Sequence, residues 1–179
     1  FDEMKLFRFI ILIPLVLFSA INFNADSSSD SRLIKIEKKL QLDYELPYLS
    51  IKDVNNKYLL KELNEMTIIN FWSSWCGPCV DEVKHLNKFQ KLIEENNLNI
   101  KIIAINIFDD LTSAKDFVIK YKPNFLLLFD DSKMIPIDFA VSGVPETYFI
   151  KENTIKFKYV GKITNEKLIE GYEKLKSIK

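Results

Sequence analysis

The only two cysteines of this 179-residue chain, Cys76 and Cys79, stand three positions apart in the string FWSSWCGPCVDE. A buried β-strand is predicted at residues 67–72 and an amphipathic helix at 78–97, so Cys76 lies where the strand gives way to the helix. Unpaired backbone N–H groups and the positive end of the helix dipole stabilise a thiolate at such a position. The spacing therefore predicts disulfide exchange, in which Cys76 attacks and Cys79 then closes a Cys76–Cys79 bond.

Two further ionisable residues follow the cysteines on the same helix. Glu82 is three residues after Cys79, on the same helix face. It can either exchange a proton with Cys79 or serve as a helix-start glutamate favoured by the dipole. His85 lies about 240° around the helix from Cys79 and should point away as an ordinary surface or half-buried residue. A zinc site needs about four ligands, more than Cys76, Cys79 and His85 supply. We therefore predict neither a metal site nor another cofactor.

Length and composition favour one folded domain and exclude several classes of function. The 25 basic and 25 acidic side chains cancel. A net charge of zero does not attract phosphate, so nucleic acid is excluded as a partner. Two cysteines cannot form the multi-disulfide framework of a small secreted scaffold. The cysteine pair is therefore present for its chemistry.

The beginning of the chain carries the pattern of an export signal. From Met4 onward, Lys5 and Arg8 precede an apolar run over residues 9–21 that continues weakly to 23. We favour an uncleaved signal anchor at 1–23 with its amino end in the cytoplasm, because the positive residues lie on that side. A cleaved signal peptide and a buried helix of the domain are the alternatives. A polar linker is predicted at 24–43, and the folded domain at 44–179.

The remaining elements alternate between strands and helices, which predicts an α/β fold with a mixed central sheet flanked by helices. A hairpin is expected at 44–60, with its turn at Asn55 and Asn56, and a second at 146–151 and 155–161. The other expected elements are strands at 67–72, 100–108 and 125–130, a helix at 111–122 capped by Thr112 or Ser113, a turn or short helix at 132–140 interrupted by Pro136, and a helix at 164–179.

Two strings resemble the signatures of a known family. NFWSSWCGPCVDE (70–82) resembles the active-site signature of the thioredoxin-like superfamily. SGVPETYFI (142–150) is similar to the second signature of its membrane-tethered branch that serves cytochrome c maturation, the CcmG/DsbE family. Acidic Phe-Asp-Asp segments at 108–110 and 129–131 fit the same branch. The resemblance implies a thioredoxin-like fold with an N-terminal hairpin and a central inserted α/β segment.

The resemblance also implies roles for individual residues. Cys76 would be the exposed nucleophile, Cys79 the resolving thiol and Glu82 a buried acid. The expected substrate-binding residues are Trp75, Val144, Pro145 and Glu146. Pro145 would follow a cis peptide bond, the backbone of Val144 would pair with an extended substrate, and Glu146 would add an acidic group near the site.

The function implied is that of a periplasm-facing dithiol reductant held at the inner membrane by a single-pass anchor. Its client would be the oxidised Cys-x-x-Cys of apocytochrome c, or a thiol carrier that holds this pair. Electrons would come from a membrane protein that relays cytoplasmic reducing power. The alternatives are a general reductant of exported proteins, an oxidase, and a holdase that binds apocytochrome and keeps its own disulfide as a structural clasp.

Overall fold

The computed structural model describes residues 33–49 and 56–178, and the predicted anchor at 1–23 lies outside this part. The strands are β1 (Ile34–Lys39), β2 (Tyr44–Pro47), β3 (Lys57–Leu60), β4 (Thr67–Trp72), β5 (Lys101–Asn106), β6 (Leu126–Phe129), β7 (Glu146–Lys151) and β8 (Thr154–Val160). The helices are α1 (Gly77–Asn96), α2 (Leu111–Tyr121), α3 (Ile135–Phe139) and α4 (Asn165–Ser177). Across these described ranges, no helix is both long and apolar enough to span a bilayer.

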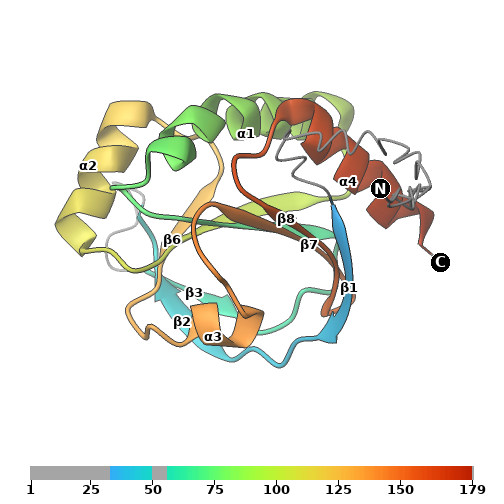
Figure 1. Cartoon of the computed structure of the whole chain (residues 1–179), viewed down its shortest axis with the longest axis horizontal. Coiled ribbons are helices and arrows are strands. Elements are labelled where there is room, and N and C mark those ends of the chain that lie inside the picture. The colour runs from blue at the N-terminus through green and yellow to red at the C-terminus, as the bar shows by residue number, and fades with distance from the viewer. Residues whose placement is uncertain (1–32, 50–55, 179) are drawn as a thin grey trace, which may run out of the picture. The chain divides into compact units, whose positions relative to one another are not determined.

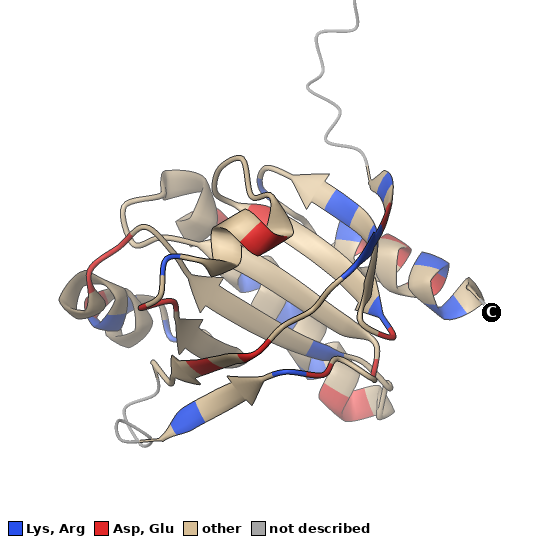
Figure 2. Ribbon diagram, turned by 90° about the horizontal axis from the view of Figure 1, so that it is seen from below, with Lys and Arg blue, Asp and Glu red and all other residues tan. Residues whose placement is uncertain are grey.

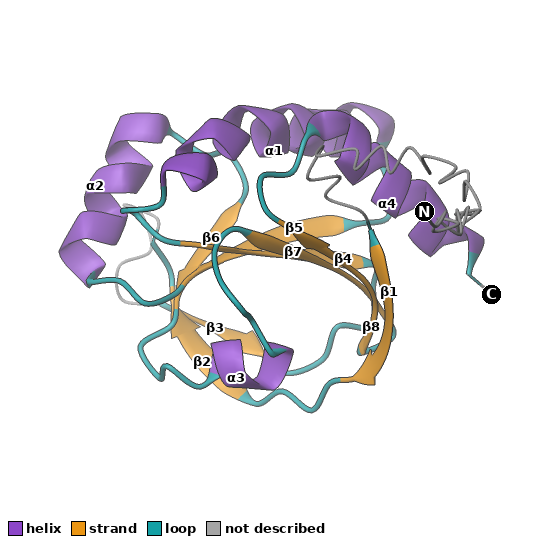
Figure 3. Cartoon of the chain, in the orientation of Figure 1, coloured by secondary structure: helices purple, strands orange, loops and turns teal. Residues whose placement is uncertain are grey.

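A six-stranded mixed sheet forms the centre of the fold, with the order β1-β8-β7-β4-β5-β6. β4, β5 and β6 are parallel, whereas β7 runs antiparallel to β4 and β8 antiparallel to β7. Helices α1 and α4 lie on one side of this sheet, and α3 lies on the other side with the β2–β3 pair (Figures 1 and 3). Basic and acidic residues are interspersed over the elements (Figure 2), in keeping with the zero net charge.

The central strand β4 contributes side chains to two hydrophobic cores, one on each face of the sheet, because side chains alternate between the two faces of a strand. Ile69 and Phe71 pack into the core on the α3 side. Ile68 packs with α1 and α4 on the opposite side. Asn70 shares this second face, which places a polar side chain directly against α1. The strand therefore builds the core and at the same time presents one amide to the helix that begins at the cysteines.

Three local features differ from the sequence-based expectations. Residues 34–39, expected within a linker at 24–43, form β1, an edge strand that pairs antiparallel with β8. Most of its side chains are exposed, so its sequence lacks the apolar pattern of an inner strand. Asp110 caps α2 through its side chain in place of Thr112 or Ser113. Pro136 lies in the first turn of α3, where its missing N–H costs nothing, so it starts this helix and does not interrupt it.

Both predicted hairpins form antiparallel strand pairs. β7 and β8 pair through a turn at Glu152 and Asn153, which both adopt positive φ. β2 and β3 also pair antiparallel, but as a separate two-stranded sheet. The predicted turn residue Asn55 between them lies outside the described residues. The segment of α2 and β6, expected as a central insertion, adds the parallel edge strand next to β5.

Candidate active site

Cys76 and Cys79 form a disulfide at the start of α1, with an S–S distance of 2.03 Å. Cys76 is the N-cap residue of the helix, and its sulfur accepts a hydrogen bond from the backbone N–H of Cys79 at 3.2 Å. Pro78 stands in the first turn, where no hydrogen-bond partner for an N–H is required. In the reduced protein, the same N–H and the helix dipole would stabilise a thiolate on Cys76.

The two sulfur-bearing residues are less accessible than the sequence suggests. Cys76 is 4% exposed and Cys79 is 1% exposed, so Cys76 is the more accessible of the two but is not an exposed side chain. Both belong to a buried cluster that also contains Trp72 and Phe117, and the half-buried Val144 packs against it.

Glu82 is buried beneath the cysteines and held by two hydrogen bonds. One oxygen accepts from Asn70 Nδ2 at 2.8 Å, and the other accepts from the backbone N–H of Ile163 at 3.1 Å. Burial raises the pKa of Glu82 from 4.5 to about 8, although the two hydrogen bonds act in the opposite direction. A carboxyl group with this pKa can both donate and accept a proton near neutral pH.

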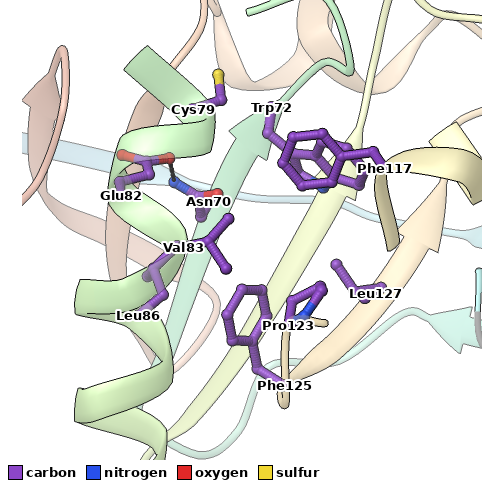
Figure 4. A pocket seen from close by; sticks show the side chains of 10 residues that line it. All are labelled: Asn70, Trp72, Cys79, Glu82, Val83, Leu86, Phe117, Pro123, Phe125 and Leu127. Atoms are coloured by element: carbon purple, nitrogen blue, oxygen red, sulfur yellow. Dashed lines mark hydrogen bonds between the residues drawn. The ribbon is translucent and has the colours of Figure 1, made fainter. Parts of the chain in front are cut away.

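Glu82 and Cys79 line the same small cavity, together with Asn70 and Trp72 (Figure 4). Its volume of about 10 Å³ is close to the space that one water molecule requires. Trp72 contributes a buried Nε1–H that has no hydrogen-bond partner within residues 33–49 and 56–178. The acid and the resolving cysteine therefore border a common cavity. His85, which the sequence places on another helix face, does not line it.

Asn70 is the site residue that sequence reasoning missed. Its Nδ2 donates to Glu82 and also to Thr147 Oγ1, at 3.1 Å, on β7. The amide thus connects the helix carboxyl to the strand that follows Pro145. A polar residue inside the otherwise apolar strand TIINFW was the available signal, because a buried amide requires hydrogen-bond partners.

The peptide bond between Val144 and Pro145 is cis. Pro145 is buried, and its carbonyl accepts a hydrogen bond from the Gly161 N–H at 2.9 Å. Val144 is half-buried and lies just before β7, outside the ladder that pairs β7 with its neighbours. Glu146 differs from the expectation of a substrate-binding acid. Its side chain is fully buried and bound to protein groups, so it offers no surface to a substrate.

Trp75 precedes the disulfide and is 65% exposed. Its Nε1 donates to the carbonyl of Phe108 at 3.0 Å, and Phe108 is itself exposed in a left-handed conformation. The two aromatic rings border a groove of about 480 Å³. The residues that line the groove are Trp75, Phe108, Asp109, Asp110, Phe129, Asp130, Asp131 and Lys133. Both predicted Phe-Asp-Asp segments therefore meet in one acidic groove that Trp75 also borders.

Comparison with known proteins agrees with this geometry. Residues 36–158 match the AhpC/TSA family. The chain is 30% identical to the thiol-disulfide oxidoreductase ResA of Bacillus cereus strain ZK / E33L over 170 residues, which cover 93% of each chain. It is 32% identical to the thiol:disulfide interchange protein DsbE of Vibrio cholerae over 117 residues, 62% of this chain and 60% of that protein.

The fold also matches solved structures. The crystal structure of a putative thiol:disulfide interchange protein DsbE from Chlorobium tepidum superposes with a TM-score of 0.66 at 20% identity, covering 79% of this chain and 99% of that one. StoA from Bacillus subtilis superposes with a TM-score of 0.63 at 20% identity, covering 75% and 98%. The predicted thioredoxin-like fold, with a mixed sheet flanked by helices, is confirmed.

Proposed function

The chain belongs to the AhpC/TSA family and is a thioredoxin-like thiol-disulfide oxidoreductase of the ResA and DsbE type, and from this premise we propose that it reduces the Cys-x-x-Cys of apocytochrome c. The observation that carries this proposal is the Cys76–Cys79 disulfide at the tip of α1, with a buried carboxyl beneath it. A thiol carrier that holds the apocytochrome cysteines is an equivalent client, because it presents the same chemical group.

The proposed reaction begins with the reduced protein. The Cys76 thiolate attacks one sulfur of the client disulfide, so the client S–S bond breaks and its other sulfur leaves as a thiolate. The Cys79 thiolate then attacks the Cys76 sulfur in this mixed disulfide, forms the bond seen in the structure and releases the second client thiolate. Two electrons pass to the client, which gains the two free thiols that haem attachment requires.

Glu82 is proposed as the group that takes the proton from Cys79 before this second attack. Both residues line the water-sized cavity, so a single water molecule can carry the proton between them. The pKa of about 8 lies close to that of an ordinary thiol, about 8.5. A carboxyl group with this pKa can accept a proton near neutral pH and later return it.

We further propose that the client approaches in an extended conformation along the backbone of Val144, between Trp75 and the cis-proline loop. Val144 is unpaired with any strand of the described sheet and packs against the cluster that contains both cysteines. Backbone pairing at a free edge accepts many client sequences, because its hydrogen bonds are made by main-chain groups. The exposed Trp75 supplies an apolar contact surface next to Cys76.

The proposed location is the periplasmic side of the inner membrane, with residues 1–23 as a single-pass anchor. The support for this is the positively flanked apolar run in the sequence. A membrane protein would supply the electrons, since an oxidising compartment does not regenerate dithiols by itself. A tether of this kind would hold the enzyme near both the electron donor and the client.

The reduction potential of the purified protein tests the proposed direction of electron flow. After equilibration with a glutathione or dithiothreitol series, a value near or below about −200 mV supports a reductant, whereas a value near about −120 mV indicates an oxidase. A second assay follows reduction of oxidised apocytochrome c after alkylation of Cys76. If alkylation abolishes reduction, the result supports the proposed reductase activity. If the protein binds apocytochrome c but does not reduce it, with or without alkylation, it is a holdase.

A further inference from the structure

The buried carboxylate of Glu146 is the centre of a polar network at the end of the cis-proline loop. One oxygen accepts from the backbone N–H of Ser142 at 3.1 Å and from the Ser142 hydroxyl. The other oxygen accepts from the Tyr148 hydroxyl at 2.5 Å and pairs with Lys158 Nζ at 2.8 Å. Glu146 is fully buried, and the Lys158 side chain is 14% exposed. A carboxylate with this set of donors is fixed in one orientation.

Lys158 connects the two ends of the loop that runs from residue 140 to residue 146. Its Nζ pairs with Glu146 at the end of the loop and donates to the carbonyl of Ala140 at the beginning, at 3.4 Å. It also lies over the ring of Tyr148, 5.4 Å from the ring centre, and the two residues are direct partners in the β7–β8 ladder. One cation on β8 therefore holds both ends of the loop against the sheet.

The loop between these two fixed points carries Val144 and Pro145. The Ser142 contact closes it near the start, and Glu146 itself follows Pro145 directly. Burial would raise the pKa of Glu146, but the hydrogen bonds from Lys158, Ser142 and Tyr148 outweigh this and lower it. The carboxylate is therefore charged at neutral pH, and loss of the lysine would leave that buried charge without its cation, which is costly.

We infer that Glu146 and Lys158 are positioning residues, whose ion pair sets the Val144 backbone at the place where the client must lie next to Cys76. This inference rests on the proposed function, because it assumes that a polypeptide client pairs along Val144. It reassigns Glu146 from a residue that touches the substrate to one that acts through the loop. It also adds Lys158, for which the sequence contains no local signal.

The test compares Lys158→Met with a matched control, Lys156→Met. Lys156 lies on the same strand, pairs with Glu37 at 3.0 Å and has a side chain that is 18% exposed, but it contacts β1 and not the loop. Two substrates are used: an oxidised Cys-x-x-Cys peptide, which needs the loop, and a small aromatic disulfide, which needs only Cys76. Each is mixed in excess with the reduced full-length protein for a single turnover, and KM is the substrate concentration that gives half the maximal rate. Misplacement by about 1 Å can cost about 10²-fold in rate.

We expect Lys158→Met to raise KM for the peptide by about tenfold, while the rate with the small disulfide and the reduction potential stay at wild-type values. Lys156→Met should change none of these quantities. Unchanged KM for the peptide in Lys158→Met, or an equal loss with both substrates, overturns the inference. If the wild-type protein reduces the small disulfide but not the peptide, the proposed function itself has failed.

A second variant keeps the inference testable if Lys158→Met does not fold. Glu146→Gln retains an oxygen acceptor and removes the buried negative charge. Of the two charges in the pair, only that of Lys158 then remains, and its side chain is partly exposed. We expect faster amide hydrogen exchange at Ser142 in this variant, together with the same rise in KM for the peptide. Wild-type protection of the Ser142 amide would show that the loop does not depend on the pair.

Discussion

Replacing Glu82 with glutamine should remove a large pH dependence from the stability of the oxidised protein. Burial raises the pKa of Glu82 from 4.5 to about 8 in the folded state. Below pH 4.5 the carboxyl is protonated in both the folded and the unfolded state, so it adds no pH dependence. Between these pKa values the unfolded chain releases the proton while the folded protein keeps it. The free energy of unfolding therefore falls as the pH rises through this window.

The magnitude follows from the two pKa values. Each pH unit between them lowers the free energy of unfolding by about 1.4 kcal/mol. The interval from 4.5 to about 8 therefore amounts to about 5 kcal/mol, of which about 3 kcal/mol is lost by pH 7. In the variant, the amide nitrogen cannot accept a hydrogen bond as the carboxyl oxygen does. This adds a cost of about 1–3 kcal/mol that does not change with pH.

Urea unfolding of the oxidised wild type and variant, from about pH 4.5 to about pH 8, separates the two contributions. Because the carboxyl is half-titrated at each end of this range, the wild type should lose about 4 kcal/mol of unfolding free energy relative to the variant between the two pH values. Glu94→Gln, an exposed position on the same helix, is the control and should follow the wild type. A difference between wild type and Glu82→Gln that stays constant with pH would refute the reasoning.

The remaining predictions concern the support of the site. Asn70→Ala removes a donor to Glu82, so the pKa of Glu82 should rise further; an unchanged pH profile of turnover would contradict this. Gly171→Ala should destabilise the protein by about 1–3 kcal/mol, because a Cβ there would lie 2.2 Å from the ring of Phe149, and an unchanged Tm would contradict it. Thr164→Ala removes the N-cap of α4 and should cost about 1 kcal/mol in urea unfolding; a variant as stable as the wild type would show that this cap is dispensable.

The sequence alone determined the reactive pair and the elements on either side of it. Strand β4 and helix α1 have strong periodic patterns, and the junction between them places Cys76 at a helix N-terminus whatever the rest of the fold does. The spacing of three residues between Cys79 and Glu82 also placed both side chains on the same face of the helix. Such features depend on neighbours within one or two helical turns, so local geometry is sufficient to predict them.

Only the tertiary structure decided what surrounds these residues. The pKa of Glu82 depends on its burial between β4 and the segment before α4, and the hydrogen bond from Ile163 spans 81 residues of sequence. Glu146 has the sequence position of a substrate-binding acid, yet pairing of β7 with β8 brings Lys158 over it and turns it into an internal ion. Strand β1 is recognisable only through its pairing with β8. The electrostatics of a buried carboxyl depend on which distant strands meet around it, and spacing along the chain does not encode that.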